Sequence, residues 1–283
     1  MDYKAEYEKW LNSPAMNEEG KKELASVSGD NKAIEYRFGA ELEFGTAGMR
    51  GIIGYGTNMM NVYTVRRATQ GLSEYIKSLG AVAMKRGVVI SYDTRRKSDE
   101  FARAAAGVLA ANGIVAYLFS DVHPVPMLSY AVRKLGTIAG IMITASHNPK
   151  EYNGYKVYGE DGAQMSPEAT EVVVGFIEKS ADYFSVREAA GSSLIKKVPA
   201  SVDKSYYKKL TKLTLSPEAV KKVGKDLKLV YTPVHGSGYV PVTTILKKLK
   251  INVTVVPEQV KKDTEFSTVE VPNPEFKETL SMG

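Results

Sequence analysis

The 283-residue sequence contains no cysteine, one tryptophan and only three histidines. The lack of cysteine excludes disulfides, thiolate nucleophiles and zinc or iron–sulfur sites that need cysteine ligands. No run of about 18 apolar residues is present to span a bilayer, and the N-terminal segment lacks the apolar core of a signal peptide. We therefore expect a cytoplasmic protein that does not insert into membranes.

Charge of neither sign dominates, because 38 basic and 32 acidic residues leave a net charge of +6. The lysines are spread out apart from pairs such as Lys221-Lys222, which we interpret as solvated surfaces, so we expect no nucleic-acid partner. A small positive surplus suits an anionic small molecule. With 43% hydrophobic and 25% charged residues the chain is globular, and its length favours about two domains of roughly 100–200 residues.

Helical and extended patterns alternate through the middle of the chain. The spacing of apolar residues predicts helices and the short β-branched runs predict strands, in the order 62–79 (helix), 87–92 (strand), 101–109 (helix), 114–118 (strand), 128–135 (helix) and 138–143 (strand). A further strand is expected at 155–158 and a helix starting near 166–168. This alternation predicts a parallel sheet covered by helices on both faces.

A second unit is predicted after a segment rich in Gly, Ser and Lys at 189–201, so we place the domain boundary between residues 1–197 and 198–283. There a strand at 227–231, a loop, a helical face and a strand at 251–256 repeat the β-loop-α-β plan. No further strand is predicted. The expected fold class is α/β, with two three-layer α/β/α units and mixed, mostly parallel sheets, the second incomplete.

Ser146, His147 and Asn148 directly follow the predicted strand at 138–143. Ligands of open parallel sheets bind at this carboxyl edge. A serine hydroxyl needs a base or electrostatic help to accept or donate a phosphoryl group, and His147 and Lys156 are candidates for both. On the residues alone, the favoured interpretation is that Ser146 and Asn148 only shape the turn before Pro149.

Other polar motifs are weaker by themselves. The glycine-rich stretch at 45–51 contains Arg50 and suits an anion, although a chain reversal explains its glycines as well. Asp93 could aim Arg95 into the same crevice, or the two could form a surface pair. His123 and His235 are expected to be loop histidines satisfied by backbone hydrogen bonds.

Two stretches, TASHNP (residues 144–149) and NGYKVY (residues 153–158), together resemble the active-site signature of the α-D-phosphohexomutase family, which contains phosphoglucomutases and phosphomannomutases. Matches in the family's order are FGTAGMRG (44–51), YDTR (92–95) and TPVHGSG (232–238). The resemblance spans about residues 38–275 and is closer to the phosphoglucomutase and phosphopentomutase branch. It implies that 1–197 is domain I, carrying the phosphoserine loop, and that 198–283 is part of domain II.

The resemblance implies a role for each matching residue. Ser146 would carry the phosphoryl group and Lys156 would be the general acid/base. His147 and Asn148 would position the phosphate or assist proton transfer, and Arg50 would neutralise charge.

We add three residues to the set that binds substrate or phosphate, together with Asn148: Thr144, Asp93 and Arg95. The substrates implied are small sugar phosphates, with glucose 1,6-bisphosphate as activator and intermediate. Mg²⁺ is implied as cofactor, and Ser146 would supply one phosphoserine oxygen to it. The family's D-x-D-x-D-R loop, which supplies the aspartate ligands, does not occur in this sequence.

These expectations describe the N-terminal half of a longer enzyme, so we expect the isolated chain to be inactive or nearly so. One alternative is a non-catalytic fragment that binds phosphosugars or a partner. A second alternative is phosphopentomutase or phosphomannomutase activity, because the sugar-reading residues of the family lie outside this sequence.

Overall fold

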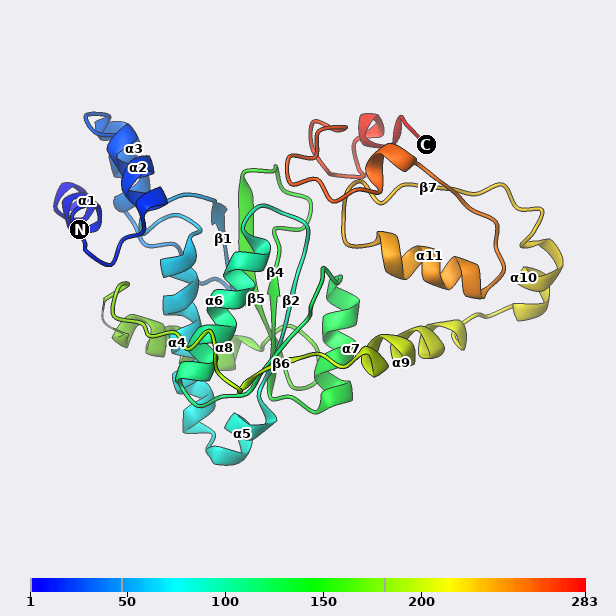
Figure 1. Cartoon of the computed structure of the whole chain (residues 1–283), viewed down its shortest axis with the longest axis horizontal. Helices are drawn as coiled ribbons and strands as arrows, with labels where there is room; N and C mark the ends of the chain where they lie inside the picture. Colours follow the sequence, from blue (N-terminus) through cyan, green and yellow to red (C-terminus); the bar gives the residue numbers. More distant parts are fainter. Residues whose placement is uncertain (1, 47, 181) are drawn as a thin grey trace.

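A computed structural model describes residues 2–46, 48–180 and 182–283 (Figure 1). The first unit is built on a six-stranded sheet with the strand order β1-β5-β4-β2-β3-β6. Its strands are β1 (Gly48–Ile52), β2 (Val88–Tyr92), β3 (Ala116–Leu118), β4 (Ala139–Ile143), β5 (Tyr152–Gly159) and β6 (Ile195–Lys197).

The sheet is mixed and mostly parallel, as predicted. β2 pairs in parallel with β3 and β4, and β3 pairs in parallel with β6. β5 runs antiparallel to both β4 and β1. The predicted strands at 87–92 and 138–143 correspond to β2 and β4, whereas β3 is shorter than predicted and β5 is longer.

Helices cover both faces of this sheet, which explains the unbroken apolar runs of β2 and β4. One face packs against the helices α4 (Val62–Ser78), α6 (Ser98–Ala111) and α8 (Pro167–Lys179). The other packs against α7 (Val125–Leu135), next to which lies α9 (Ala200–Thr211). A short helix, α5 (Ala81–Arg86), links α4 to β2.

Local sequence determines where α4 begins and where α7 ends. The side chain of Asn61 accepts hydrogen bonds from the backbone N–H groups of Tyr63 and Thr64, and the Thr64 hydroxyl accepts one from the Asn61 N–H, which makes a capping box at the start of α4. α7 ends at Gly136, whose φ of 67° is in the left-handed region that favours glycine.

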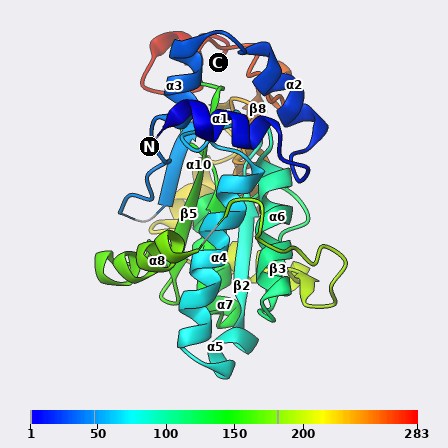
Figure 2. The same cartoon turned by 90° about the vertical axis from the view of Figure 1, so that its left-hand side faces the viewer.

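Three N-terminal helices lie outside the predicted elements: α1 (Tyr3–Leu11), α2 (Glu18–Ser26) and α3 (Asn31–Phe38). Figures 1 and 2 place them at the end of α4 opposite to α5. They are held by a cluster of aromatic rings around the buried Trp10. The Trp10 ring centroid lies 5.2 to 5.7 Å from those of Phe38, Tyr63, Tyr183 and Phe184.

The second unit is smaller and follows α9. It contains α10 (Pro217–Val223), α11 (Tyr239–Lys248), the 3-10 turns η1 (Pro257–Gln259) and η2 (Lys277–Leu280), and the parallel strands β7 (Val230–Tyr231) and β8 (Thr254–Val255). The predicted β-loop-α-β order is present, although each strand is reduced to two residues. The boundary between 197 and 198 stays a prediction, and β6 ends at Lys197 while α9 begins at Ala200.

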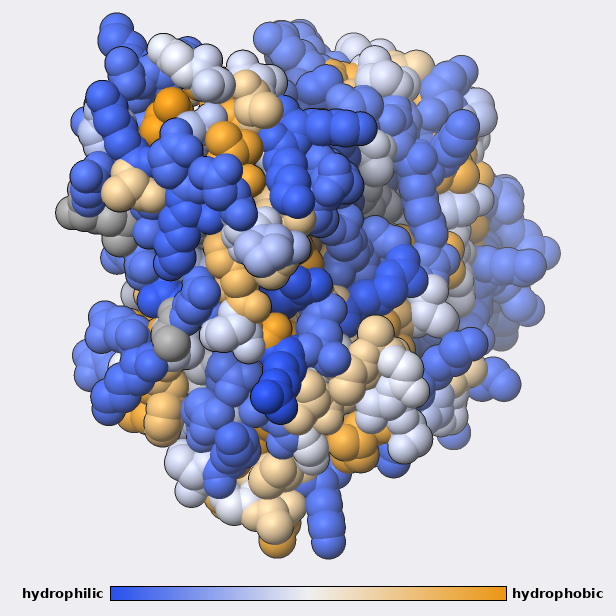
Figure 3. All heavy atoms as spheres, turned by 60° about the vertical axis from the view of Figure 1, so that its left-hand side comes forward, coloured by the Kyte–Doolittle hydropathy of each residue, from blue (hydrophilic) through white to orange (hydrophobic). Residues whose placement is uncertain are grey.

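On the face drawn in Figure 3, hydrophilic side chains predominate and hydrophobic ones gather in small separate groups. No helix in the described part of the chain is both long and apolar enough to cross a membrane.

Replacing Phe38 by alanine is expected to lower the free energy of unfolding of the first unit by about 3–5 kcal/mol, because its buried ring packs edge-on against Tyr7 and Trp10. Urea unfolding followed by the fluorescence of Trp10, the only tryptophan, measures the loss. Tyr36→Ala is the matched control, since this residue of α3 is 53% exposed and its loss should change stability by less than about 0.5 kcal/mol.

Candidate functional site

Ser146 lies in the loop between β4 and β5, just beyond the carboxyl end of β4. Its side chain is exposed, and its Oγ lies 3.3 Å from Nδ1 of the exposed His147. Its φ of 58° is in the left-handed region, which is uncommon for a residue other than glycine. A neighbouring hydroxyl supports this conformation, because Oγ1 of Thr144 accepts a hydrogen bond of 3.0 Å from the Ser146 N–H.

The carboxylate of Asp93 organises the inner side of this loop. It accepts hydrogen bonds from the hydroxyl of Thr144 at 2.6 Å, the hydroxyl of Ser98 at 2.8 Å and the N–H of Arg95 at 3.0 Å. Burial raises the pKa of Asp93, while these hydrogen bonds and the charge of Arg95 act in the opposite direction. Asp93 and Thr144 thus stabilise the loop from its buried side.

The guanidinium of Arg95 is directed at this loop between β4 and β5, residues 144–151, which we call the serine loop. Its side chain is 1% exposed and its Nε lies 3.6 Å from Oδ2 of Asp93, so the two form a buried pair and not a surface pair. It donates four hydrogen bonds of 2.6 to 3.1 Å to the carbonyl groups of residues in or next to the loop, namely Ser146, Asn148, Pro149 and Tyr152. The planar fork of an arginine can bind several oxygens at once, which a lysine could not do in the same way. Arg95 therefore stabilises the conformation of the serine loop.

Arg50 and Lys156 come to the same face of the sheet through the pairing of β1 with β5. Gly48 is opposite Lys156, and Arg50 is opposite Gly154, so the two cations are diagonal neighbours. The strands can pair this closely because Gly48 has a φ of 149° and an added Cβ would collide with the carbonyl oxygen of Tyr155. Arg50 also donates a hydrogen bond of 2.8 Å to Oδ1 of Asn148.

Lys156 is half-buried and lies opposite Met142 of β4. Burial and the nearby positive charge of Arg50 lower the pKa of its ammonium group, against the smaller opposing effect of Asp93. A lysine with a lowered pKa is better suited to exchange a proton near neutral pH than an exposed one.

A cleft of about 540 Å³ lies between the serine loop and the second unit. One wall contains Ser146, His147 and Thr144 together with the buried pair of Asp93 and Arg95. The other wall belongs to the second unit and is formed by Thr232, Pro233, Val234, Gly236, Ser237, Phe266, Pro272, Pro274 and Leu280. Arg50, Asn148 and Lys156 are outside the residues that line this cleft, although Met142, opposite Lys156, is among them.

The other two histidines have structural partners, as expected. His235 is buried, with Nδ1 2.8 Å from the carbonyl oxygen of Lys261 and Nε2 2.7 Å from Oγ1 of Thr268. His123 has its Nδ1 2.9 Å from the carbonyl oxygen of Asp121 and its Nε2 3.1 Å from Oδ2 of Asp203. The bonds to the side chains of Thr268 and Asp203 go beyond the predicted backbone contacts, and the second of them joins the start of α7 to α9.

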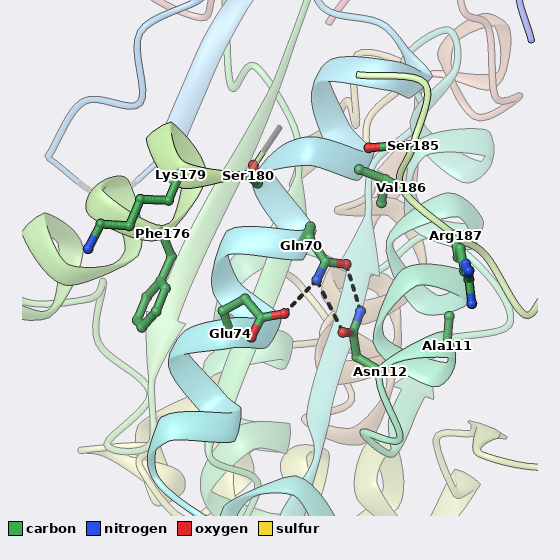
Figure 4. Close-up of a pocket in the computed structure, with 10 residues that line it drawn as sticks. All are labelled: Gln70, Glu74, Ala111, Asn112, Phe176, Lys179, Ser180, Ser185, Val186 and Arg187. Atoms are coloured by element: carbon green, nitrogen blue, oxygen red, sulfur yellow. Dashed lines mark hydrogen bonds between the residues drawn. The ribbon is translucent and has the colours of Figure 1, made fainter. Parts of the chain in front are cut away.

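A second cavity of about 500 Å³ contains none of the predicted site residues (Figure 4). It lies between α4, the end of α6 and residues of the segments 176–180 and 185–187. The amides of Gln70 and Asn112 bond to each other in both directions, and Gln70 also donates to Glu74, so these groups are satisfied within the protein.

The described residues do not fit a complete metal site. No three histidine, aspartate or glutamate side chains within residues 2–46, 48–180 and 182–283 are grouped so as to hold a metal ion. Asp93, the carboxylate beneath the loop, is fully engaged by Thr144, Ser98 and Arg95.

Comparison with known proteins identifies two matching domains. The profile of phosphoglucomutase/phosphomannomutase α/β/α domain I matches residues 41–184, and that of domain II matches residues 204–283. Phosphoglucomutases of Staphylococcus aureus strains MRSA252 and N315 are each 42% identical over 249 residues, covering 86% of this chain and 44% of the relative. The chain thus spans less than half the length of these curated relatives.

Solved structures share the fold. A Thermus thermophilus protein assigned as a phosphomannomutase is 27% identical with a TM-score of 0.70, covering 86% of this chain and 51% of that one. A phosphoglucomutase/phosphomannomutase family protein of Burkholderia thailandensis, 21% identical with a TM-score of 0.63, covers 84% of this chain and 48% of that one.

Replacing Arg50 by glutamine is expected to raise the pKa of Lys156, because one of the two effects that lower it is removed. A folded-state lysine pKa below the unfolded value means that the unfolded chain binds the proton more tightly. The resulting destabilisation is fully present below the folded pKa of Lys156, decreases as the pH rises above it, and is gone once the pH passes the unfolded pKa. An NMR titration of the Lys156 side chain measures the shift. Arg133→Gln, which removes an exposed arginine of α7, is the control and should leave this pKa unchanged.

Proposed function

The chain belongs to the phosphoglucomutase/phosphomannomutase family, and from this premise we propose that it carries the phosphoserine half of a phosphosugar mutase active site. Ser146 is the residue that holds the phosphoryl group. The observation that carries the proposal is the position of the Ser146 hydroxyl, exposed beyond the end of β4 beside His147 and in a loop fixed by Asp93 and Arg95.

The charges around the loop support a phosphorylated serine. A phosphoserine carries about −1.5 to −2 charges at neutral pH and gains from nearby cations and amide donors. Arg50, tied to Asn148, and the half-buried Lys156 supply positive charge on the adjoining strands. Thr144, Asp93 and Arg95 act indirectly, because they stabilise the conformation of the loop that carries Ser146.

The reaction proposed is a pair of phosphoryl transfers. A hydroxyl oxygen of the sugar phosphate attacks phosphorus, the bond from phosphorus to Oγ of Ser146 breaks, and the serine oxygen takes a proton from Lys156 while the sugar hydroxyl loses its own proton to a base. The sugar bisphosphate then returns its other phosphoryl group to Ser146 by the reverse steps. Positioning and charge stabilisation are what such transfers need from a protein.

For the substrate we propose glucose phosphates, with glucose 1,6-bisphosphate as the intermediate, because the Staphylococcus aureus relatives are named phosphoglucomutases. Mannose phosphates are the second choice, which the name of the Thermus thermophilus protein favours. We propose Mg²⁺ dependence for the whole enzyme, as the resemblance to the family implies, and the phosphoserine would give one ligand to the ion. Since the chain spans 44% of these relatives, we expect at most trace turnover from it alone.

Incubation with radiolabelled glucose 1,6-bisphosphate tests the proposal. We expect label on the wild-type chain and none on Ser146→Ala, because the acceptor oxygen is gone. Lys156→Met should slow labelling by about 100-fold, the effect expected for loss of a general acid/base. Digestion and mass spectrometry should locate the label in the peptide that contains residue 146.

Ser78→Ala is the control, since Ser78 is an exposed serine at the end of α4, and it should be labelled like the wild type. Label that persists on Ser146→Ala would contradict the assignment of the nucleophile. No label on the wild type with Mg²⁺ present would favour the alternative, a module that binds phosphosugars without chemistry.

A further inference from the structure

The guanidinium of Arg95 joins the serine loop to the second unit. Its edges donate to the loop carbonyls, while its Cζ lies 5.4 Å from the centroid of the Phe266 ring. Phe266 is 4% exposed, so this contact is shielded from water. The same cation is thus held between a loop of the first unit and a ring that comes far later in the chain.

A second contact lies beside the first. Glu265 accepts a hydrogen bond of 3.0 Å from Nζ of Lys150, which belongs to the serine loop, and lies 3.8 Å from Nε of Arg96. These side chains are nearly half exposed, so their ion pairs are weak. They nevertheless add a second contact between the turn at 263–268 and the serine loop.

The turn that presents Phe266 is itself firmly built. Phe266 has a φ of 50°, which a bulky residue adopts only where its surroundings hold it there. The carboxylate of Asp263 accepts hydrogen bonds of 2.9 Å from the N–H groups of Glu265 and Ser267, and bonding by Ser267 lowers its pKa to about 2. Thr268 is bonded to the buried His235 at 2.7 Å.

We infer that Phe266, assisted by Glu265, is a positioning residue for the serine loop, so that the second unit determines where the Ser146 hydroxyl stands. The ring keeps water from one face of the Arg95 guanidinium, and buried charge-assisted hydrogen bonds are stronger than hydrated ones. Without the ring, water competes for the same N–H groups and the loop carbonyls are held less firmly. The importance of this for catalysis rests on the proposed function, but the order of the loop can be measured without it.

Hydrogen exchange of the 283-residue chain, followed by mass spectrometry, tests the inference. Phe266→Leu removes the ring and keeps an apolar side chain, and we expect the amides at 146–152 to exchange about fivefold faster while those of β4 do not change. Phe266→Tyr keeps the ring and should restore the wild-type rate. Phe276→Leu alters a half-exposed ring of the second unit and should leave the loop unchanged.

Unchanged exchange at 146–152 in Phe266→Leu, with faster exchange only at 263–268, would overturn the inference, because the ring would then serve the second unit alone. If this variant unfolds the second unit, seen as fast exchange throughout 217–283, Glu265→Gln tests the same contact from its surface side. A rise confined to 146–152 is expected there, and no rise would again overturn the inference.

Labelling by glucose 1,6-bisphosphate separates this inference from the proposed function. A positioning role predicts that Phe266→Leu lowers the maximal labelling rate while the half-saturating concentration stays the same. Faster loop exchange in a protein that takes no label would contradict the proposed function and keep the positioning role. Normal labelling of Phe266→Leu together with unchanged exchange at 146–152 would support the proposed function and contradict the positioning role.

Discussion

The conformation of the serine loop depends on a buried ion pair beneath it. Asp93 and Arg95 lie at the end of β2, and between them they bind the hydroxyl of Thr144 and four carbonyl groups of the loop and its flank. A buried pair of this kind costs desolvation energy and adds little stability by itself, but removal of one partner leaves an uncompensated charge. Its value here is conformational, since it holds Ser146 in a left-handed conformation that the chain would otherwise seldom adopt.

The site is consequently divided between groups that are accessible and groups that are not. Ser146, His147 and Arg50 are exposed, while Asp93, Thr144 and Arg95 are largely buried and occupied by the protein. Motif matching selects both kinds alike, because a short motif includes the residues that shape a loop as well as those that meet the ligand. Only the three-dimensional contacts, such as the bond from Arg95 to the carbonyl of Tyr152, distinguish the two.

The sequence predicts the elements whose structure is determined by local residue patterns. It does not predict those whose structure is determined by tertiary packing. β2 and β4 were predicted because their β-branched runs are flanked by glycine and polar turns, and the resemblance located the serine loop between β4 and β5. The helices α1 to α3 are not among the predicted elements, and they are held in place by the aromatic rings around Trp10, which come from distant parts of the chain. Nothing in the sequence near Phe266 indicated that its ring would reach Arg95, because the two are separated by most of the chain.

The close pairing of β1 and β5 has a consequence for any redesign of this site. Gly48 and Gly154 are positions where a methyl group would collide with the backbone of the opposite strand. The separation of Arg50 from Lys156 is therefore set by main-chain contact and not by the size of the surrounding side chains. An engineer who wished to accommodate a larger anion between these two cations would have to alter the register of the strands, since exchanging neighbouring side chains could not move them apart.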